Sequence, residues 1–199
     1  MNMVLKYLVN GSLNPGKSCL DIHRHLITLF AFIVSMNAKN VLELGVRQGC
    51  STLPMLLGVE ATGGFLTSVD LEAHKFKCPK EFNNYWRFVK SDSLKYLSSL
   101  DKNVIFDIVL IDDWHSYMHV KKELELVEKH VTKSSIILVH DLMARTEPDY
   151  NTKCEGKLFN KEQWEGGGPC RAVFELDPKK WEFATIPICN GLTLLRKKL

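Results

Sequence analysis

The feature that most constrains the fold is an apolar run ending in a glycine-rich turn, the stretch NVLELGVRQGCS at residues 40–51. Its aliphatic residues predict a buried strand, and the apolar periodicity that resumes at Leu53 predicts a helix. In an open α/β sheet, such a turn lies at the carboxyl end of a central strand, where cofactors bind. Gly45 and Gly49 give the backbone the freedom that a tight turn and a close ligand require. We therefore expect a cofactor site at this turn.

Further apolar runs alternate with amphipathic helical stretches along the rest of the chain. This alternation indicates a parallel sheet that is covered on both faces. The C-terminal segment is typical of two strands that meet at a tight turn, Asn190-Gly191. The predicted fold is therefore α/β, a Rossmann-like doubly wound sheet of about seven strands, mostly parallel with a C-terminal antiparallel hairpin. The predicted strands after the first are residues 65–69, 86–89, 106–111, 136–139, 181–188 and 192–196, and the longest predicted helices are residues 20–36 and 117–130.

The chain has 199 residues, of which 45% are hydrophobic, and this suits one domain with a sizeable core. Residues 144–169 are polar and irregular, and a stretch of that kind usually carries function. We expect a single domain over residues 1–199, with these parts: an N-terminal turn and helix (1–38), a cofactor-binding core (39–142), a substrate loop (143–170) and a C-terminal helix and hairpin (171–199).

Composition limits the classes of partner. The net charge of +3 is small and evenly spread, which argues against a nucleic-acid partner. The six cysteines form no C-x-x-C pair, and we read them as reduced thiols. No apolar run is long enough to span a membrane, and the first residues do not resemble a signal peptide. We expect a cytoplasmic protein with a small-molecule substrate and no nucleic-acid or membrane partner, and a homodimer is left open.

Acidic residues follow the predicted parallel strands. Asp70, Asp92, Asp112 and Asp141 each lie at or just past a strand end, and Glu43 directly precedes the glycine turn. Asp70 comes about 20 residues past the turn, where an acid can accept the ribose hydroxyls of a nucleotide-type cofactor. Some of these acids are also expected to cap the helices that follow them.

The turn itself narrows the choice of cofactor. It reads E-x-G-x-x-x-G and lacks the G-x-G-x-x-G of a dinucleotide site, which disfavours a nicotinamide dehydrogenase. With Glu43 beside it, the turn suits a cationic amino-acid moiety better than a phosphate.

Four motifs in order resemble class I S-adenosylmethionine-dependent methyltransferases, namely VLELGVRQGCST, TSVDLE, VKSDSLKYL and FDIVLIDDWHSYMHVKKELEL. More narrowly, they resemble the branch of small-molecule O-methyltransferases and cephalosporin-hydroxylase-like proteins. The resemblance covers about residues 20–142 and implies S-adenosylmethionine as the cofactor. By position, the resemblance implies that the turn residues Gly45, Val46 and Gly49 contact the methionine moiety, that Ser51 binds its carboxylate and that Glu43 forms the pocket floor. It implies that Asp70 binds the ribose and that Leu71, Asp92 and Ser93 contact the adenine. Asp112 would lie next to the amino group and the transferable methyl group.

The metal-dependent members of this branch hold magnesium with acids or amides at the ends of the fourth and fifth strands. Asp112 and Asp141 match two of those positions, while Leu142 stands where the family often has Asn or Asp. Two carboxylates with substrate hydroxyls still suit magnesium. His115 or His140 are further candidate ligands, although imidazole suits a transition metal better. Metal assistance is left open.

The reaction that the resemblance implies is in-line methyl transfer to a hydroxyl oxygen, which needs positioning and removal of a proton. His115, together with Asp112, is the candidate catalytic pair, because histidine titrates near neutrality. The alternative for His115 is a helix-start residue bonded to the backbone. His23 and His25 are read as surface or cap residues. The acids and lysines between residues 144 and 170 favour a polar acceptor, such as a sugar or a sugar-bearing metabolite.

Two other functions stay open. Residues Gly11 to Ser18 match the Walker A pattern G-x-x-x-x-G-K-[ST], so a P-loop nucleotide-binding protein is one alternative. Pro15 weakens it, because proline offers no amide to a phosphate. The other is a non-catalytic S-adenosylmethionine-binding or hydroxylase-like relative, which Leu142 allows.

Overall fold

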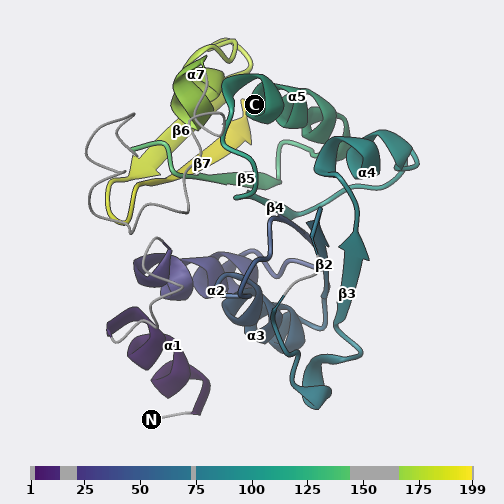
Figure 1. Cartoon of the computed structure of the whole chain (residues 1–199), viewed down its shortest axis with the longest axis vertical. Helices are drawn as coiled ribbons and strands as arrows, with labels where there is room; N and C mark the ends of the chain where they lie inside the picture. Colours follow the sequence, from purple (N-terminus) through teal and green to yellow (C-terminus); the bar gives the residue numbers. More distant parts are fainter. Residues whose placement is uncertain (1–2, 14–21, 73–74, 144–165, 199) are drawn as a thin grey trace.

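The computed structural model describes residues 3–13, 22–72, 75–143 and 166–198, and seven strands in them form one sheet. The strand order is β3-β2-β1-β4-β5-β7-β6 (Figure 1). β7 runs antiparallel to both of its neighbours, and the other neighbouring strands pair in parallel. The predicted α/β fold, with its C-terminal antiparallel hairpin, is confirmed. The strands are β1 (Asn40–Leu44), β2 (Phe65–Asp70), β3 (Trp86–Lys90), β4 (Ile108–Ile111), β5 (Ile136–His140), β6 (Trp181–Ile186) and β7 (Leu192–Lys197).

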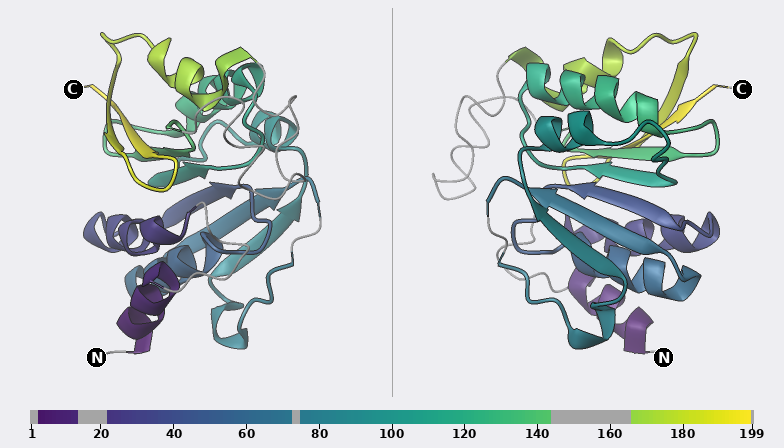
Figure 2. Two further views of the ribbon diagram at one scale, coloured as in Figure 1. Left: turned by 60° about the vertical axis from the view of Figure 1, so that its left-hand side comes forward. Right: turned by 90° about the vertical axis from the view of Figure 1, so that its right-hand side faces the viewer.

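Helices cover both faces of the sheet (Figures 1 and 2). One layer holds α1 (Met3–Leu13), α2 (Leu26–Ser35) and α3 (Thr52–Thr62), and the other holds α4 (Ser93–Ser99), α5 (Tyr117–Val127) and α7 (Gly168–Phe174). The two long helices predicted from the sequence each include a 3-10 turn, at His23–His25 before α2 and at Glu128–His130 after α5. A third 3-10 turn, Lys80–Phe82, precedes β3.

The central strands are buried on both faces, which explains their continuous apolar sequences. Ile108 and Leu110 of β4 enter the core under α1, α2 and α3. Val109 and Ile111 of the same strand enter the core under α4, α5 and α7. Each such side chain contributes about 1.5–3 kcal/mol on burial. These four residues of one strand thus pack against both helix layers.

The sheet reverses its order of winding beside β1. This strand pairs with β2 on one side and with β4 on the other, and α3 and α5 cover opposite faces. In doubly wound folds, the crevice at such a reversal receives the ligand at the carboxyl ends of the strands. The strand-end residues predicted from the sequence lie at this edge.

The loop between β6 and β7 returns to the same edge. Cys189, Asn190 and Gly191 all adopt left-handed conformations, with φ of 42°, 64° and 86°. The Asn190 carbonyl accepts a hydrogen bond from the Met143 amide at 2.6 Å. The predicted Asn-Gly turn is therefore present within a longer loop that packs against the end of β5.

The P-loop alternative is wrong for the residues that the structure describes. Gly11, Ser12 and Leu13 form the last turn of α1, so a helix and not a strand precedes the motif. Residues 14–18 of the motif lie outside the described residues. A phosphate-binding loop needs the strand–loop–helix context that α1 replaces.

Two further observations bear on the expected setting of the protein. Within the described ranges, no helix has both the length and the apolar character that a membrane span requires. Cys78, Cys170 and Cys189 are free thiols, whereas Cys50 is disulfide-bonded. The expectation of six reduced cysteines is therefore wrong for Cys50.

Candidate functional site

The glycine turn after β1 packs closely between the ends of β2 and β4. Gly45 has a φ of 95°, which favours glycine, and its amide donates to the Val69 carbonyl at 2.9 Å. A Cβ at Gly45 would lie 2.2 Å from the backbone oxygen of Asp112. Only glycine fits here, because both the backbone conformation and the neighbouring strand end exclude a side chain.

The backbone amides of the turn are already committed to protein acceptors. Val46 and Arg47 donate to Asp70 Oδ2 at 2.8 and 3.1 Å, and Gly49 donates to the Val46 carbonyl at 2.7 Å. The Gly45 amide is hydrogen-bonded as well, so these four backbone amides are not available as donors to a phosphate. The geometry therefore argues against a dinucleotide at this turn, as the missing third glycine does.

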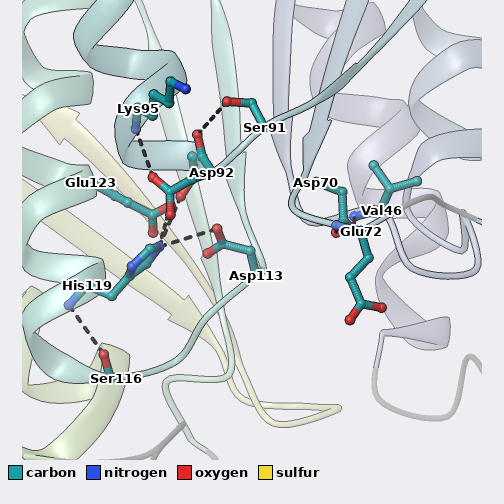
Figure 3. Close-up of polar contacts among 11 residues, drawn as sticks. Val46, Asp70, Glu72, Ser91, Asp92, Lys95, Asp113, Ser116, His119 and Glu123 are labelled. Atoms are coloured by element: carbon teal, nitrogen blue, oxygen red, sulfur yellow. Dashed lines mark hydrogen bonds and ion pairs between the residues drawn. The ribbon is translucent and has the colours of Figure 1, made fainter.

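Asp70 joins the end of β2 to the turn (Figure 3). Its second oxygen, Oδ1, accepts a hydrogen bond from the Glu72 amide at 2.9 Å. Leu71, the predicted adenine contact, is 66% exposed beside it. An acid with spare lone pairs next to an exposed apolar side chain fits a ribose with its base. The binding roles of Asp70 and Leu71 stay predictions.

Glu43 lies beneath the turn and is fully buried. Ser51, Thr52 and Ser68 donate hydrogen bonds to its carboxylate at 2.6, 2.9 and 2.5 Å. Burial raises the pKa of Glu43 to about 7, and these three hydroxyls oppose that rise. Glu43 therefore braces β1 against β2 and α3. The predicted contacts of Glu43 and Ser51 with a cofactor are not tested by this arrangement.

Asp92 and Ser93 begin α4. The carboxylate of Asp92 caps the helix, since Oδ1 accepts the Lys95 amide at 2.9 Å (Figure 3). The Ser93 hydroxyl is buried and lies 3.0 Å from Nε2 of His119. Both side chains have structural partners, and their predicted contact with adenine stays a prediction.

Asp112, His115 and Asp141 meet where β4 and β5 end. His115 Nε2 lies 2.9 Å from Asp141 Oδ2 and 3.5 Å from Asp112 Oδ1. Asp141 follows β5 with a φ of 66°, a left-handed conformation that costs free energy in most residues. The structure brings together the predicted metal pair, Asp112 and Asp141, and the predicted catalytic pair, Asp112 and His115, because parallel strands bring their ends to one edge. The roles of these residues stay predictions.

The charges in this group alter its titration. Burial lowers the pKa of His115, but the charge of Asp141 and the hydrogen bonds of both carboxylates outweigh burial and raise that pKa to about 10. His115 and His140 in turn hold the pKa of Asp112 and of Asp141 below the usual range, against the effect of burial. The expectation that His115 titrates near neutrality is therefore wrong for this arrangement, in which it holds a proton at neutral pH.

Two more histidines lie behind this group. His140 contacts Asp112 Oδ1 through Nδ1 at 3.1 Å, and its Nε2 lies 2.8 Å from the Cys189 carbonyl. His25 is fully buried, with Nε2 2.8 Å from the Ile188 carbonyl, so the prediction of a surface residue is wrong. His25 does occupy the N-cap position of α2, although its side chain makes no capping hydrogen bond. The ring of His25 meets that of His140 edge-on at 5.6 Å.

The donor set at the ends of β4 and β5 can be tested against a metal. Asp112, His115 and Asp141 each offer one ligand atom, and these atoms lie within 4.8 Å of one another. Leu142 is buried in the core under α5 and supplies no oxygen. Two carboxylates and an imidazole fit a divalent transition-metal ion better than the all-oxygen shell that magnesium prefers. Magnesium itself stays a prediction.

The sequence reading missed a second group, formed by Asp113, His119 and Glu123. His119 and Glu123 lie one turn apart on α5 and share a face, and Asp113 reaches them from the loop after β4 (Figure 3). The signal that would have found the group was the spacing of four residues between a histidine and a glutamate on a helix next to a strand-end acid.

Comparison with known proteins gives a consistent result. The family model described as a methyltransferase domain matches residues 42–142. A protein of Arabidopsis thaliana, provisionally named a caffeoyl-CoA O-methyltransferase, is 28% identical over 188 residues, covering 87% of this chain and 75% of that protein. The SAH-bound methyltransferase PaMTH1 of Podospora anserina shares the fold with a TM-score of 0.67 at 13% identity, covering 100% of this chain and 89% of that one. An O-methyltransferase of Bacillus cereus in complex with SAH has a TM-score of 0.64 at 16% identity, covering 100% and 92%.

Proposed function

This chain belongs to the methyltransferase domain family, and we propose that it transfers a methyl group from S-adenosylmethionine to a hydroxyl oxygen of a polar small molecule. The observation that carries the proposal is the double contact of Asp112. Its backbone packs against Gly45 of the turn, and its carboxylate contacts His115 and His140. The proposed cofactor turn therefore lies next to the titratable side chains of Asp112, His115 and His140. Methyl transfer to a hydroxyl requires this proximity, because the acceptor must be positioned beside the cofactor and must lose its proton.

S-adenosylmethionine suits the edge around the turn better than a phosphate-bearing cofactor does. The amides at Gly45, Val46, Arg47 and Gly49 have protein acceptors, so the turn offers little to a pyrophosphate. Carboxylates near a turn suit an ammonium or a sulfonium group instead. Solved methyltransferases of the same fold, bound to SAH, support this choice.

The residues of this chain would position the acceptor and manage its proton. Asp112 and Asp141 attract a hydroxyl group, and protonated His115 donates a hydrogen bond to the acceptor oxygen. His115 accepts the acceptor's proton only when the pull of the two carboxylates on its own proton is reduced. A divalent cation held by Asp112 and Asp141 would offset those charges, leave the imidazole of His115 free to take the proton, and lower the pKa of the acceptor hydroxyl.

Two classes of acceptor are in question. The polar residues 144–170 favour a sugar or a sugar-bearing metabolite, although residues 144–165 lie outside the described part of the chain. The name of the Arabidopsis thaliana relative points instead to a phenolic hydroxyl of an acyl-CoA ester. We propose the polar, hydroxylated acceptor and treat the phenolic one as the second candidate.

A turnover assay with labelled S-adenosylmethionine tests the proposal directly. The protein is incubated with a panel of sugars, sugar-bearing metabolites and phenolic esters, with and without a divalent cation. We expect label in a methyl ether of at least one hydroxylated compound. Tight binding of S-adenosylmethionine without turnover on either class would favour the non-catalytic alternative.

A further inference from the structure

Three oxygen-bearing side chains surround one nitrogen of His119, away from the group at Asp112. Nε2 of His119 lies 3.5 Å from Asp113 Oδ2, 3.3 Å from Glu123 Oε1 and 3.0 Å from Ser93 Oγ. Asp113 comes from the loop after β4 and Glu123 from α5 (Figure 3), and Ser93 begins α4. An imidazole Nε2 carries at most one hydrogen and cannot bond all three oxygens well.

Burial makes this shortage of donors costly. Glu123 is fully buried, and neither of its oxygens accepts a hydrogen bond of ordinary geometry from the described residues, although Ser93 and His119 face it. Oδ1 of Asp113 is also buried and accepts no hydrogen bond from the described residues. Buried carboxylates are stable only when positive charge or donors compensate them. Here a single imidazole, that of His119, faces both carboxylates.

The spacing of the donors matches that of ligands around a small divalent ion. Zinc lies about 2.0–2.2 Å from nitrogen and carboxylate ligands, which places two ligand atoms of a tetrahedral site about 3.3–3.5 Å apart. The separations from Nε2 to the two carboxylates are 3.5 and 3.3 Å. All three candidate ligand atoms lie within 4.8 Å of one another. We propose that Asp113, His119 and Glu123 bind a divalent transition-metal ion such as Zn²⁺.

The donor types also select the class of ion. Two carboxylates with one imidazole suit zinc or another first-row ion, whereas calcium and magnesium prefer oxygen alone. Ser93 Oγ or a water supplies a fourth position. The site is separate from the one formed by Asp112, His115 and Asp141, and it does not depend on the proposed methyl transfer.

The bound ion has a structural consequence. It links the first two turns of α5 to the loop that carries Asp112 and His115, and also to the start of α4 where Ser93 is the fourth ligand. An ion that binds the folded protein and not the unfolded chain raises the stability of the fold. Removal of the ion is therefore expected to loosen the segment that holds Asp112 and His115.

Calorimetry with Zn²⁺ on chelator-treated full-length protein tests the site. An Asp141→Asn background weakens the other group, so that one site dominates. We expect one equivalent of Zn²⁺ to bind, and Glu123→Gln in the same background to weaken it about 100-fold or more. Glu125→Gln is the matched control, since Glu125 lies on the exposed side of α5 and pairs with Lys122.

Thermal unfolding gives a second readout that does not require catalysis. Zn²⁺ is expected to raise the melting temperature of the Asp141→Asn protein and of its Glu125→Gln derivative, but not that of the Glu123→Gln derivative. Asp113→Asn, in a half-buried loop residue, replaces Glu123→Gln if the latter fails to fold. The proposal is overturned if the parent protein binds no Zn²⁺, or if binding survives both substitutions. Protonated His119 would then be the ion that neutralises the two carboxylates.

Discussion

Asp70 Oδ2 accepts a hydrogen bond from the Val46 amide at 2.8 Å, so the acid at the end of β2 holds the turn that follows β1 (Figure 3). One carboxylate thus shapes the turn and is also the predicted ligand of the ribose. Binding of the cofactor and order in the turn are therefore expected to depend on the same side chain.

Asp70→Ala is expected to lower the affinity for S-adenosylmethionine by about 100-fold or more, because hydrogen bonds to a charged acceptor contribute about 1.5–3 kcal/mol each. Calorimetry measures this change. Asp101→Ala is the matched control, since Asp101 also bonds a nearby backbone amide, that of Asn103 at 2.8 Å, but far from the turn. Unchanged binding in the Asp70 variant would contradict the assignment.

Gly45→Ala is expected to destabilise the fold by more than the roughly 1–3 kcal/mol of a strained backbone conformation, because the new methyl group also meets the Asp112 backbone. Gly63→Ala is the control: Gly63 has a φ of 65°, and a Cβ there would have no neighbour within 4 Å. Urea unfolding of both variants gives the loss in unfolding free energy for each, and the difference between them is the cost of the steric clash beyond that of the backbone conformation. Equal losses of stability would show that the contact with Asp112 is unimportant.

Glu43 makes stability depend on pH in a predictable direction. Burial raises its pKa from 4.5 to about 7 in the folded state, against the hydroxyls that bond it, so the folded protein binds this proton more tightly than the unfolded chain. The stabilising effect of protonation is complete below about pH 4.5, is lost as pH rises to about 7, and changes no further above that. The total is on the order of 3 kcal/mol.

Glu43→Gln removes that titration. Unfolding free energies of the two proteins between pH 4.5 and 8 are compared, and the difference between wild type and variant is expected to change across this window. A difference that stays constant with pH would mean that Glu43 keeps an ordinary pKa in the folded protein.

Asp141→Asn tests the group at the ends of β4 and β5. Asparagine tolerates the left-handed conformation at this position and removes only the charge. We expect binding of S-adenosylmethionine to be unchanged and turnover to fall by about 100-fold, the range of one group that manages a proton or an acceptor. Equal turnover in the two proteins would remove Asp141 from the reaction.

Local sequence patterns were enough to predict the sheet and the edge that carries the site. The apolar run at β1, the turn at Gly45 and the acids at the strand ends follow from rules about neighbouring residues. Asp112 could be paired in advance with Asp141 and with His115, because parallel strands end at one edge.

Contacts between distant parts of the chain were not predictable in this way. His25 is buried because it meets the Ile188 carbonyl, 163 positions away. The pKa of His115 depends on two carboxylates whose distances no spacing gives. Gly11 to Leu13 match a nucleotide-binding pattern by letters alone, while their backbone belongs to α1.

The most direct test of the account is calorimetric titration of the wild-type protein with S-adenosylmethionine, ATP and NAD in parallel. We expect one site with micromolar or tighter affinity for S-adenosylmethionine and no comparable binding of the two phosphate-bearing cofactors. Preferential binding of ATP or NAD would contradict it.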